Sequence, residues 1–338
     1  MEPDSRHTIN VLQAGRALAA FAVVLTHAAL AASEFDHPFP GMVILRQGYL
    51  GVDFFFVLSG FIIYHSTAGR GRSAGSYVSA RIRRVFLPYW PVGIGLALLY
   101  TFFPVVRGNG MDWEWLPTLT LLPVDSKPAL FVAWTLQHEI LFYGVFGLFY
   151  FADLLWLGLG AWAAMIIVGS YSGVPFAPIN TEFLFGIGAA WLYRKDVGHP
   201  FLLIFAATIT LLWIFLGAQQ GQSILIGLAC AAAILQLARA ERKGRIRVPA
   251  FLVAAGGASY SVYLVHGPAI SLVARIVSHS WPTTLFFGIV AGLAAGIAYH
   301  IGIERHLIAL FPRRRECKAE GAPDALSRKA SISPATPD

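Results

Sequence analysis

Two residues whose side chains could take part in catalysis or binding lie within the first long apolar stretch of the chain, residues 11–32. They are Arg16 and His27. On a helix their spacing is close to three full turns, so both side chains project from one face, about 16 Å apart along the axis. A charge in lipid costs about 2.5–3.5 kcal/mol unless it faces protein or a water-filled cavity. The spacing therefore predicts a polar stripe that faces other helices.

Further titratable residues interrupt later apolar stretches, namely Asp53, His138, Glu139 and His266. With the N-terminus inside, we place them with His27 toward the outer side of a membrane. A histidine titrates near neutral pH, and a carboxylate can orient it and stabilise its charged form. His27, Glu139 and Asp53 are therefore the candidate catalytic residues. For each histidine the alternative is an interhelical hydrogen bond without a catalytic role.

A second group of residues, all arginines, is expected toward the inner side of the membrane. Arg81 and Arg84 are one helical turn apart, so they can share a face and bind one anionic group. The alternative is an anchor of cytoplasmic positive charge whose side chains reach toward the headgroups. Arg16 fits that alternative less well, because it lies within the first apolar stretch rather than beside it.

The composition indicates an all-α, polytopic membrane protein. Of the 338 residues, 57% are hydrophobic and 13% are charged, whereas soluble domains carry about 25% charged residues. We predict about ten transmembrane helices, each near the ~20 residues that a bilayer requires. Their expected ranges are 10–32, 48–66, 85–104, 129–150, 154–171, 180–194, 200–217, 221–238, 250–272 and 283–311.

The basic residues predict the orientation, because Lys and Arg concentrate in cytoplasmic loops. Both termini are expected in the cytoplasm, and the net charge of +7 then reflects basic loops rather than nucleic-acid binding. The loops expected inside hold Arg70, Arg72, Arg81, Arg83, Arg84, Arg194, Lys195, Arg239, Arg242, Lys243, Arg245 and Arg247. Those expected outside hold Arg46, Arg107, Lys127 and Arg275.

The two ends of the chain and its cysteines need separate interpretation. Residues 1–31 have some features of a signal peptide, but the apolar run is longer than a typical one and contains polar residues, so we expect it to be retained. Residues 312–338 are expected to form a disordered, basic cytoplasmic tail. Cys230 and Cys317 are not expected to pair, and no metal-ligand spacing is present.

Several stretches, taken in order, resemble the acyltransferase 3 family of integral membrane O-acyltransferases, and most closely its exopolysaccharide O-acetyltransferase branch. The resemblance covers nearly the whole chain, with 1–311 as one transmembrane domain. It is carried by Arg16 and His27 with ten residues between them, GVDFFFVLSGF (51–61), RIRRVFLPYW (81–90), WTLQHEILFY (134–143), EFLFGIGAAWL (182–192), ASYSVYLVHGP (258–268) and Ile303-Glu304. One departure is His138, where the family commonly has an aromatic residue.

The resemblance implies an acetyl-CoA donor that enters from the cytoplasm and no metal. It also implies an acceptor hydroxyl on an extracytoplasmic or lipid-linked saccharide, and a location in the bacterial inner membrane. Polysaccharide assembly machinery is a further candidate partner. His27 would be the catalytic histidine, Arg16 the arginine within the membrane, and Glu139 the motif glutamate. Contacts to the CoA phosphates would come from Arg81 and Arg84, and candidate substrate-binding residues are Trp134, Tyr143 and His266.

Two mechanisms and two other functions remain open from the sequence. His27 can act as a base toward the sugar hydroxyl, with its charge balanced by Glu139 or Asp53, or it can form a covalent acetyl-histidine. Buried His, Glu and Arg residues also suit a proton-coupled transporter or flippase of a lipid-linked saccharide. A structural scaffold of an export complex is the third interpretation.

Overall fold

The computed structural model describes residues 9–34, 41–71, 73–107, 112–169, 173–216, 223–277 and 280–311. Within these ranges the regular elements are all helical and no strand occurs, which confirms the all-α prediction. The predicted tail, 312–338, lies outside the described residues.

The helices are α1 (Asn10–Ala32), α2 (Met42–Arg46), α3 (Leu50–Thr67), α4 (Ala74–Phe102), α5 (Pro104–Arg107), α6 (Trp115–Thr120), α7 (Trp134–Phe151), α8 (Leu155–Val168), α9 (Thr181–Arg194), α10 (Phe201–Leu216), α11 (Ser223–Arg242), α12 (Ala250–Val277), α13 (Trp281–Tyr299) and α14 (Arg305–Leu310). Short 3-10 turns are η1 (Gln47–Tyr49), η2 (Phe131–Ala133), η3 (Val174–Phe176) and η4 (Pro178–Asn180), and a π-helical segment, η5 (His300–Glu304), joins α13 to α14.

Six stretches of the described chain are long and apolar enough to cross a membrane: Asn10–Ala32, Met42–Thr67, Ala74–Phe102, Ile224–Arg242, Ala250–Val277 and Trp281–Leu310. The other four predicted ranges hold α7, α8, α9 and α10. Of these, α8 and α9 have 14 residues each, fewer than the ~20 of a straight crossing. Ten crossings and the cytoplasmic location of both termini therefore stay predictions.

Helix α4 begins at Ala74 rather than at the predicted residue 85, so Arg81 and Arg84 lie inside it. The Ser73 side chain caps its first turn by accepting a hydrogen bond from the Ser76 backbone N–H at 3.2 Å. Interior prolines Pro88 and Pro91 do not end the helix. The prediction of a later start treated the polar residues before 85 as a loop, but a capped helix extends naturally beyond the lipid into water.

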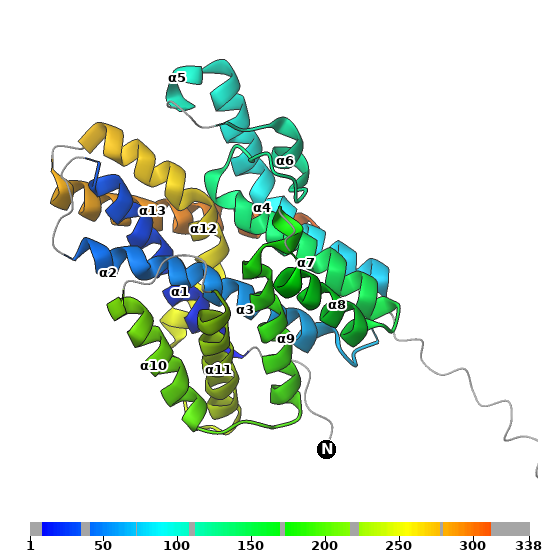
Figure 1. Ribbon diagram of the computed structural model, residues 1–338. Coiled ribbons are helices and arrows are strands. Elements are labelled where there is room, and N and C mark those ends of the chain that lie inside the picture. Colours follow the sequence, from blue (N-terminus) through cyan, green and yellow to red (C-terminus); the bar gives the residue numbers. More distant parts are fainter. Residues whose placement is uncertain are drawn as a thin grey trace, which may run out of the picture.

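Helices α1 and α3 lie in the middle of the bundle (Figure 1). Helix α1 packs on α12 and α13 on one side and on α3 on another, while α3 packs on α9 and α11. The buried face of α1 is rich in alanine, which lets neighbouring backbones approach closely. A Cβ atom added at Gly51 of α3 or at Gly256 of α12 would overlap backbone atoms of α1, at Ala19 and Gln13 respectively. The helix that carries Arg16 and His27 is thus closely packed between α3 and α12.

The first turn of α1 is capped by a residue that is distant in the sequence. No side chain of α1's own N-terminus forms a cap. Instead the Glu241 carboxylate, near the end of α11, accepts hydrogen bonds from the backbone N–H groups of Asn10 at 2.9 Å and Val11 at 2.7 Å. An anionic acceptor at a helix N-terminus satisfies free donors and matches the helix dipole.

Candidate active site

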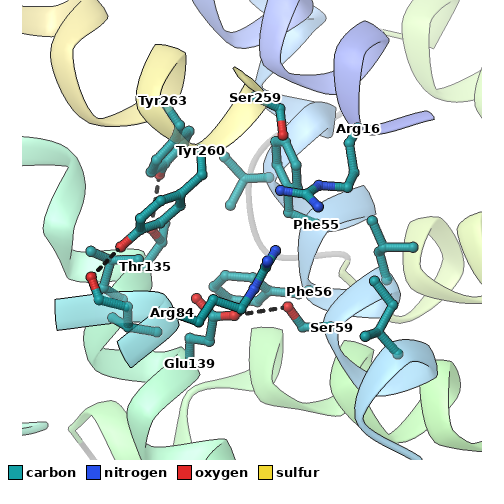
Figure 2. A pocket seen from close by; sticks show the side chains of 15 residues that line it. Arg16, Phe55, Phe56, Ser59, Arg84, Thr135, Glu139, Ser259, Tyr260 and Tyr263 are labelled. Atoms are coloured by element: carbon teal, nitrogen blue, oxygen red, sulfur yellow. Dashed lines mark hydrogen bonds between the residues drawn. The ribbon is translucent and has the colours of Figure 1, made fainter. Parts of the chain in front are cut away.

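One pocket gathers polar side chains from α1, α3, α4, α7 and α12 (Figure 2). It contains about 670 Å³ of space not filled by atoms. Its charged and polar lining residues are Arg16, Ser59, Arg84, Thr135, Glu139, Ser259, Tyr260 and Tyr263, and its apolar ones are Val52, Phe55, Phe56, Leu58, Ile62, Val85 and Leu136. The predicted inner arginine of α1, one arginine of α4 and the motif glutamate of α7 therefore meet at one place.

Two arginines reach this pocket from different helices. Arg16 is 8% exposed and lies within α1, whereas Arg84 on α4 is exposed. In the described chain the Arg16 guanidinium has one hydrogen bond, to the Gln13 side chain of its own helix at 3.4 Å. Guanidinium groups present several donors in a fork that matches phosphate and carboxylate oxygens. Arg16 therefore has donors available for an anion in the pocket, and Arg84 is the more exposed of the two arginines.

Glu139 supplies the negative charge of the pocket and is held in place by two hydroxyl groups. Ser59 Oγ donates to Glu139 Oε1 at 3.1 Å, and the Tyr143 hydroxyl donates to the same oxygen. The Tyr143 ring also lies under the Arg81 guanidinium, 5.6 Å from the ring centre. Arg81 packs against Tyr77 in the same way, at 5.7 Å, and does not line the pocket. Arg81 and Tyr143 thus form a layer behind Arg84 and Glu139.

His138 and Glu139 face different surroundings, as expected for neighbours on a helix. Glu139 lines the pocket, whereas His138 is buried and its Nδ1 lies 2.8 Å from Asn180 Oδ1. The ring of Trp134 meets that of His138 edge to face at 5.7 Å, and Trp134 is 37% exposed. His138 therefore ties α7 to the turn before α9 and takes no part in the pocket.

His27 lies outside the pocket lining, farther along α1. Its Nδ1 is 2.9 Å from the carbonyl oxygen of Val23 and 3.3 Å from Nε2 of His266. Phe131, which is 60% exposed, meets the His27 ring edge to face at 6.0 Å. His266 has no exposed surface, and its own Nδ1 is 3.0 Å from Val262 O. Two histidines predicted separately are therefore direct neighbours.

Tyr263 connects the pocket to the two histidines. Its hydroxyl lies 2.8 Å from Thr135 Oγ1, and both residues line the pocket. Its ring centre is 5.7 Å from that of His266. A second tyrosine of α12, Tyr260, donates to the Val85 carbonyl of α4 at 2.9 Å. The tyrosines of α12 thus brace the pocket wall against α4 and α7.

Asp53 belongs to neither group. It is buried and its carboxyl group lies against that of Glu182 on α9, which is fully buried. Both oxygens of the Glu182 carboxyl group are buried without a hydrogen-bond partner in the described part of the chain. Glu182 lies in the family motif 182–192 but was not predicted to be a site residue. Its signal was present in the sequence, because a glutamate within an apolar run requires a buried partner.

Sequence reasoning also missed several pocket residues. Ser59, Thr135, Ser259, Tyr260 and Tyr263 are uncharged, and hydroxyl groups in apolar helices are common enough to give no signal by themselves. Tyr143, in contrast, lies one turn after Glu139 and was among the candidates. Across the described ranges, no group of three or more His, Cys, Asp or Glu side chains is placed to hold a metal ion.

Comparison with known proteins adds the family. The acyltransferase 3 family, described as an acyltransferase domain, matches residues 9–301. The chain belongs to this family. It is 29% identical over 294 residues to the exopolysaccharide production protein ExoZ of Rhizobium meliloti (strain 1021), which covers 79% of this chain and 92% of that protein. No solved structure matches the chain. The protein is therefore a membrane-embedded O-acyltransferase, as the motifs indicated.

Proposed function

We propose that this acyltransferase moves an acetyl group from cytoplasmic acetyl-CoA to a hydroxyl of an extracytoplasmic or lipid-linked saccharide during exopolysaccharide modification. The observation that carries the proposal is the convergence of Arg16 and Arg84 on one pocket. The similarity to an exopolysaccharide production protein supports the acceptor class. Six apolar helices support the membrane location, which we take to be the bacterial inner membrane.

The charges of the pocket suit the donor. CoA carries phosphate groups, and arginine forks bind phosphate oxygens in two-pronged geometry. Arg84, the more exposed arginine, would receive a phosphate first, and Arg81, held over Tyr77 and Tyr143, adds positive charge nearby. When no donor is bound, the negative charge of Glu139 offsets the repulsion between the two pocket arginines. A nucleotide held there leaves the pantetheine arm to extend along α1.

The separation of Arg16 from His27 suits the length of that arm. Both lie on α1, about 16 Å apart along the helix axis. Tyr263 lines the pocket and touches the histidine pair, so the arm would pass beside it. The thioester then reaches His27 while the phosphates stay among the arginines.

The transfer itself requires a base at His27. His27 takes the proton of the sugar hydroxyl, and the hydroxyl oxygen forms a bond to the thioester carbonyl carbon. The carbon–sulfur bond breaks, and the departing thiolate takes the proton from His27 to leave as free CoA. Neither Glu139 nor Asp53 has a described contact with His27, so we assign Glu139 to the donor pocket rather than to the base.

Exposed aromatic side chains near His27 suit a saccharide acceptor. Phe131 is 60% exposed and its ring meets that of His27, whereas Trp134, 37% exposed and one turn of chain further on, meets the ring of His138 instead. Sugar rings present apolar faces that pack on aromatic rings. The acceptor would approach His27 from this side, opposite to the arginines.

Two measurements test the proposal. Purified protein should bind CoA in detergent, and cells with a working copy should carry O-acetyl groups on a surface saccharide, seen by NMR, that cells without it lack. His27→Ala should abolish acetylation and keep CoA binding, whereas His306→Ala, on exposed α14, should keep both. A protein that binds no CoA would instead favour a transporter, and full acetylation by His27→Ala would exclude this site.

A further inference from the structure

The two neighbouring histidines share one local geometry. In each, Nδ1 faces the carbonyl oxygen one turn earlier in its own helix: Val23 O for His27 at 2.9 Å and Val262 O for His266 at 3.0 Å. A carbonyl oxygen can only accept a hydrogen bond, so each Nδ1 carries the proton of the neutral ring. Each Nε2 is then left with a free lone pair.

This tautomer makes His266 an acceptor toward His27. Nε2 of His266 lies 3.3 Å from Nδ1 of His27, and the two rings are 4.9 Å apart at 67°. The Nδ1–H group of His27 is therefore shared between Val23 O and His266 Nε2. Nε2 of His27 remains available for a proton from outside the pair.

The surroundings leave His266 little freedom to turn. It has no exposed surface and packs beside Tyr263, whose hydroxyl is held by Thr135. A Cβ added at Gly292 of α13 would lie 3.3 Å from His266 Cβ and equally close to Val24 of α1. Helix α13 thus packs closely on both α1 and α12 beside the two histidines.

We infer that His266 is a positioning residue for His27, an inference that rests on the proposed function. It holds the His27 ring with Nε2 toward the acceptor hydroxyl. When Nε2 takes the hydroxyl proton, the Nδ1–H bond to His266 strengthens, because the donor is then charged. The proton stays on His27 until the CoA thiolate takes it, and no proton moves to His266. Direct substrate contact by His266 is not needed for this role.

A neutral imidazole in this place has a physical advantage over a carboxylate. In the described chain, neither histidine ring contacts a carboxylate, a lysine or an arginine, and the nearby titratable side chain is Tyr263. A buried anion is costly in a medium of low polarity when its partner is uncharged. His27 is neutral between turnovers, so an uncharged acceptor avoids that cost.

The test compares two replacements of His266 in the purified, full-length protein. His266→Leu removes the acceptor and should lower kcat for acetyl transfer by about 100-fold or more, within the range of general base catalysis. The KM for acetyl-CoA should stay within about twofold of its original value, because the donor pocket is unchanged. His266→Gln places an amide oxygen near the same position and should restore kcat to within about tenfold of the original protein.

Each outcome separates this inference from the function on which it rests. An active His266→Leu protein alongside an inactive His27→Ala protein would overturn the positioning role and leave the proposed base intact. Equal losses in the Leu and Gln proteins, or a large rise of KM in both, would also overturn it, since they indicate a packing role. An active His27→Ala protein would remove the base itself.

Discussion

Thr135 of α7 and Tyr263 of α12 share a hydrogen bond of 2.8 Å, and the same tyrosine ring lies 5.7 Å from that of His266. This pair joins two helices at the point where the arginine-lined pocket meets the histidine pair. Residues on both sides of the site thus depend on one contact between hydroxyl groups.

The Thr135–Tyr263 contact should be visible as a coupling free energy. Tyr263→Phe and Thr135→Val each remove the bond and should lower the free energy of unfolding by about 0.5–1.5 kcal/mol. Each hydroxyl also lies within hydrogen-bond distance of the Val132 carbonyl oxygen, that of Thr135 at 2.9 Å and that of Tyr263 at 3.3 Å. The double variant should therefore lose less than the sum of the two single losses, because the bond between the hydroxyl groups is counted in both. Thermal unfolding of the four proteins in one detergent measures this. Strictly additive losses would show that the contact contributes nothing.

Arg16 and Arg84 should govern donor affinity. Arg16→Gln and Arg84→Gln should each raise the Kd for CoA about tenfold or more, because a hydrogen bond to a charged group contributes about 1.5–3 kcal/mol. Calorimetry with CoA in detergent measures the change.

Arg83→Gln is the matched control for the arginine variants. Arg83 lies on α4 beside Arg84, but its guanidinium donates to Ser79 O at 3.2 Å and Phe311 O at 3.1 Å, away from the pocket. Its replacement should leave the Kd for CoA unchanged. An equal loss in all three variants would mean that general positive charge, rather than the pocket, attracts CoA.

Gly256 should be sensitive to a single added methyl group. In Gly256→Ala the new Cβ would overlap the backbone of Gln13, so α12 must move away from α1 and the contact between His27 and His266 must loosen. Acetyl transfer should fall and the unfolding temperature should drop. Gly257→Ala is the control, because its Cβ meets nothing within 4 Å. Similar behaviour of the two variants would argue against close packing of α1 on α12.

Asp196, in the loop after α9, should give the protein an acid-sensitive contribution to stability. Hydrogen bonding by Arg239, at 3.0 Å, holds the pKa of its carboxyl group below the ordinary 3.8, and nearby Arg242 and Lys243 act in the same direction. Because the pKa is lowered by folding, the contribution is complete above the unfolded value and is lost as the pH falls through the folded value. Asp196→Asn should therefore unfold more easily than the original protein at pH 7.

The difference between these two proteins should vanish in strong acid. Unfolding midpoints measured between pH 7 and pH 2 would show the curves converge below the ordinary carboxyl pKa. Since the Asp196 side chain is 55% exposed, high salt should also reduce the difference at neutral pH. Parallel curves across the whole range would show that the loop contact does not depend on charge.

The sequence predicted the helical class, and three of its candidate residues, Arg16, Arg84 and Glu139, line one pocket. A charge in an apolar run must face protein, so Arg16 pointed to a site before any partner was known. The hydrophobic pattern could not show which helix lies opposite. His27 and His266 are 239 residues apart, and their contact depends on how α12 is placed against α1. Asp53 had the same kind of signal as Glu139, yet it meets Glu182 on the other side of α3.

The number of crossings was less accessible to sequence reasoning than the site. Helix α8 has 14 residues and ends before the predicted limit of 171, whereas α9, also 14 residues long, agrees with its predicted span of 180–194 to within one residue. Apolar turns between helices have the same composition as the helices themselves, so hydropathy does not separate them. The early start of α4 escaped prediction because Ser73 forms a cap, which composition alone does not reveal.

The carboxylate of Glu241 has a consequence for biosynthesis. It holds the first turn of α1 although 230 residues separate it from Val11 in the chain. Membrane proteins are inserted from the N-terminus onward, so the helix with Arg16 and His27 enters the bilayer long before its anchor has been translated. Its depth and rotation can be fixed only when the end of α11 arrives, and α12 with His266 follows directly afterwards. The first turn of α1 therefore gains its cap only after α11 has been made, although α1 is made first.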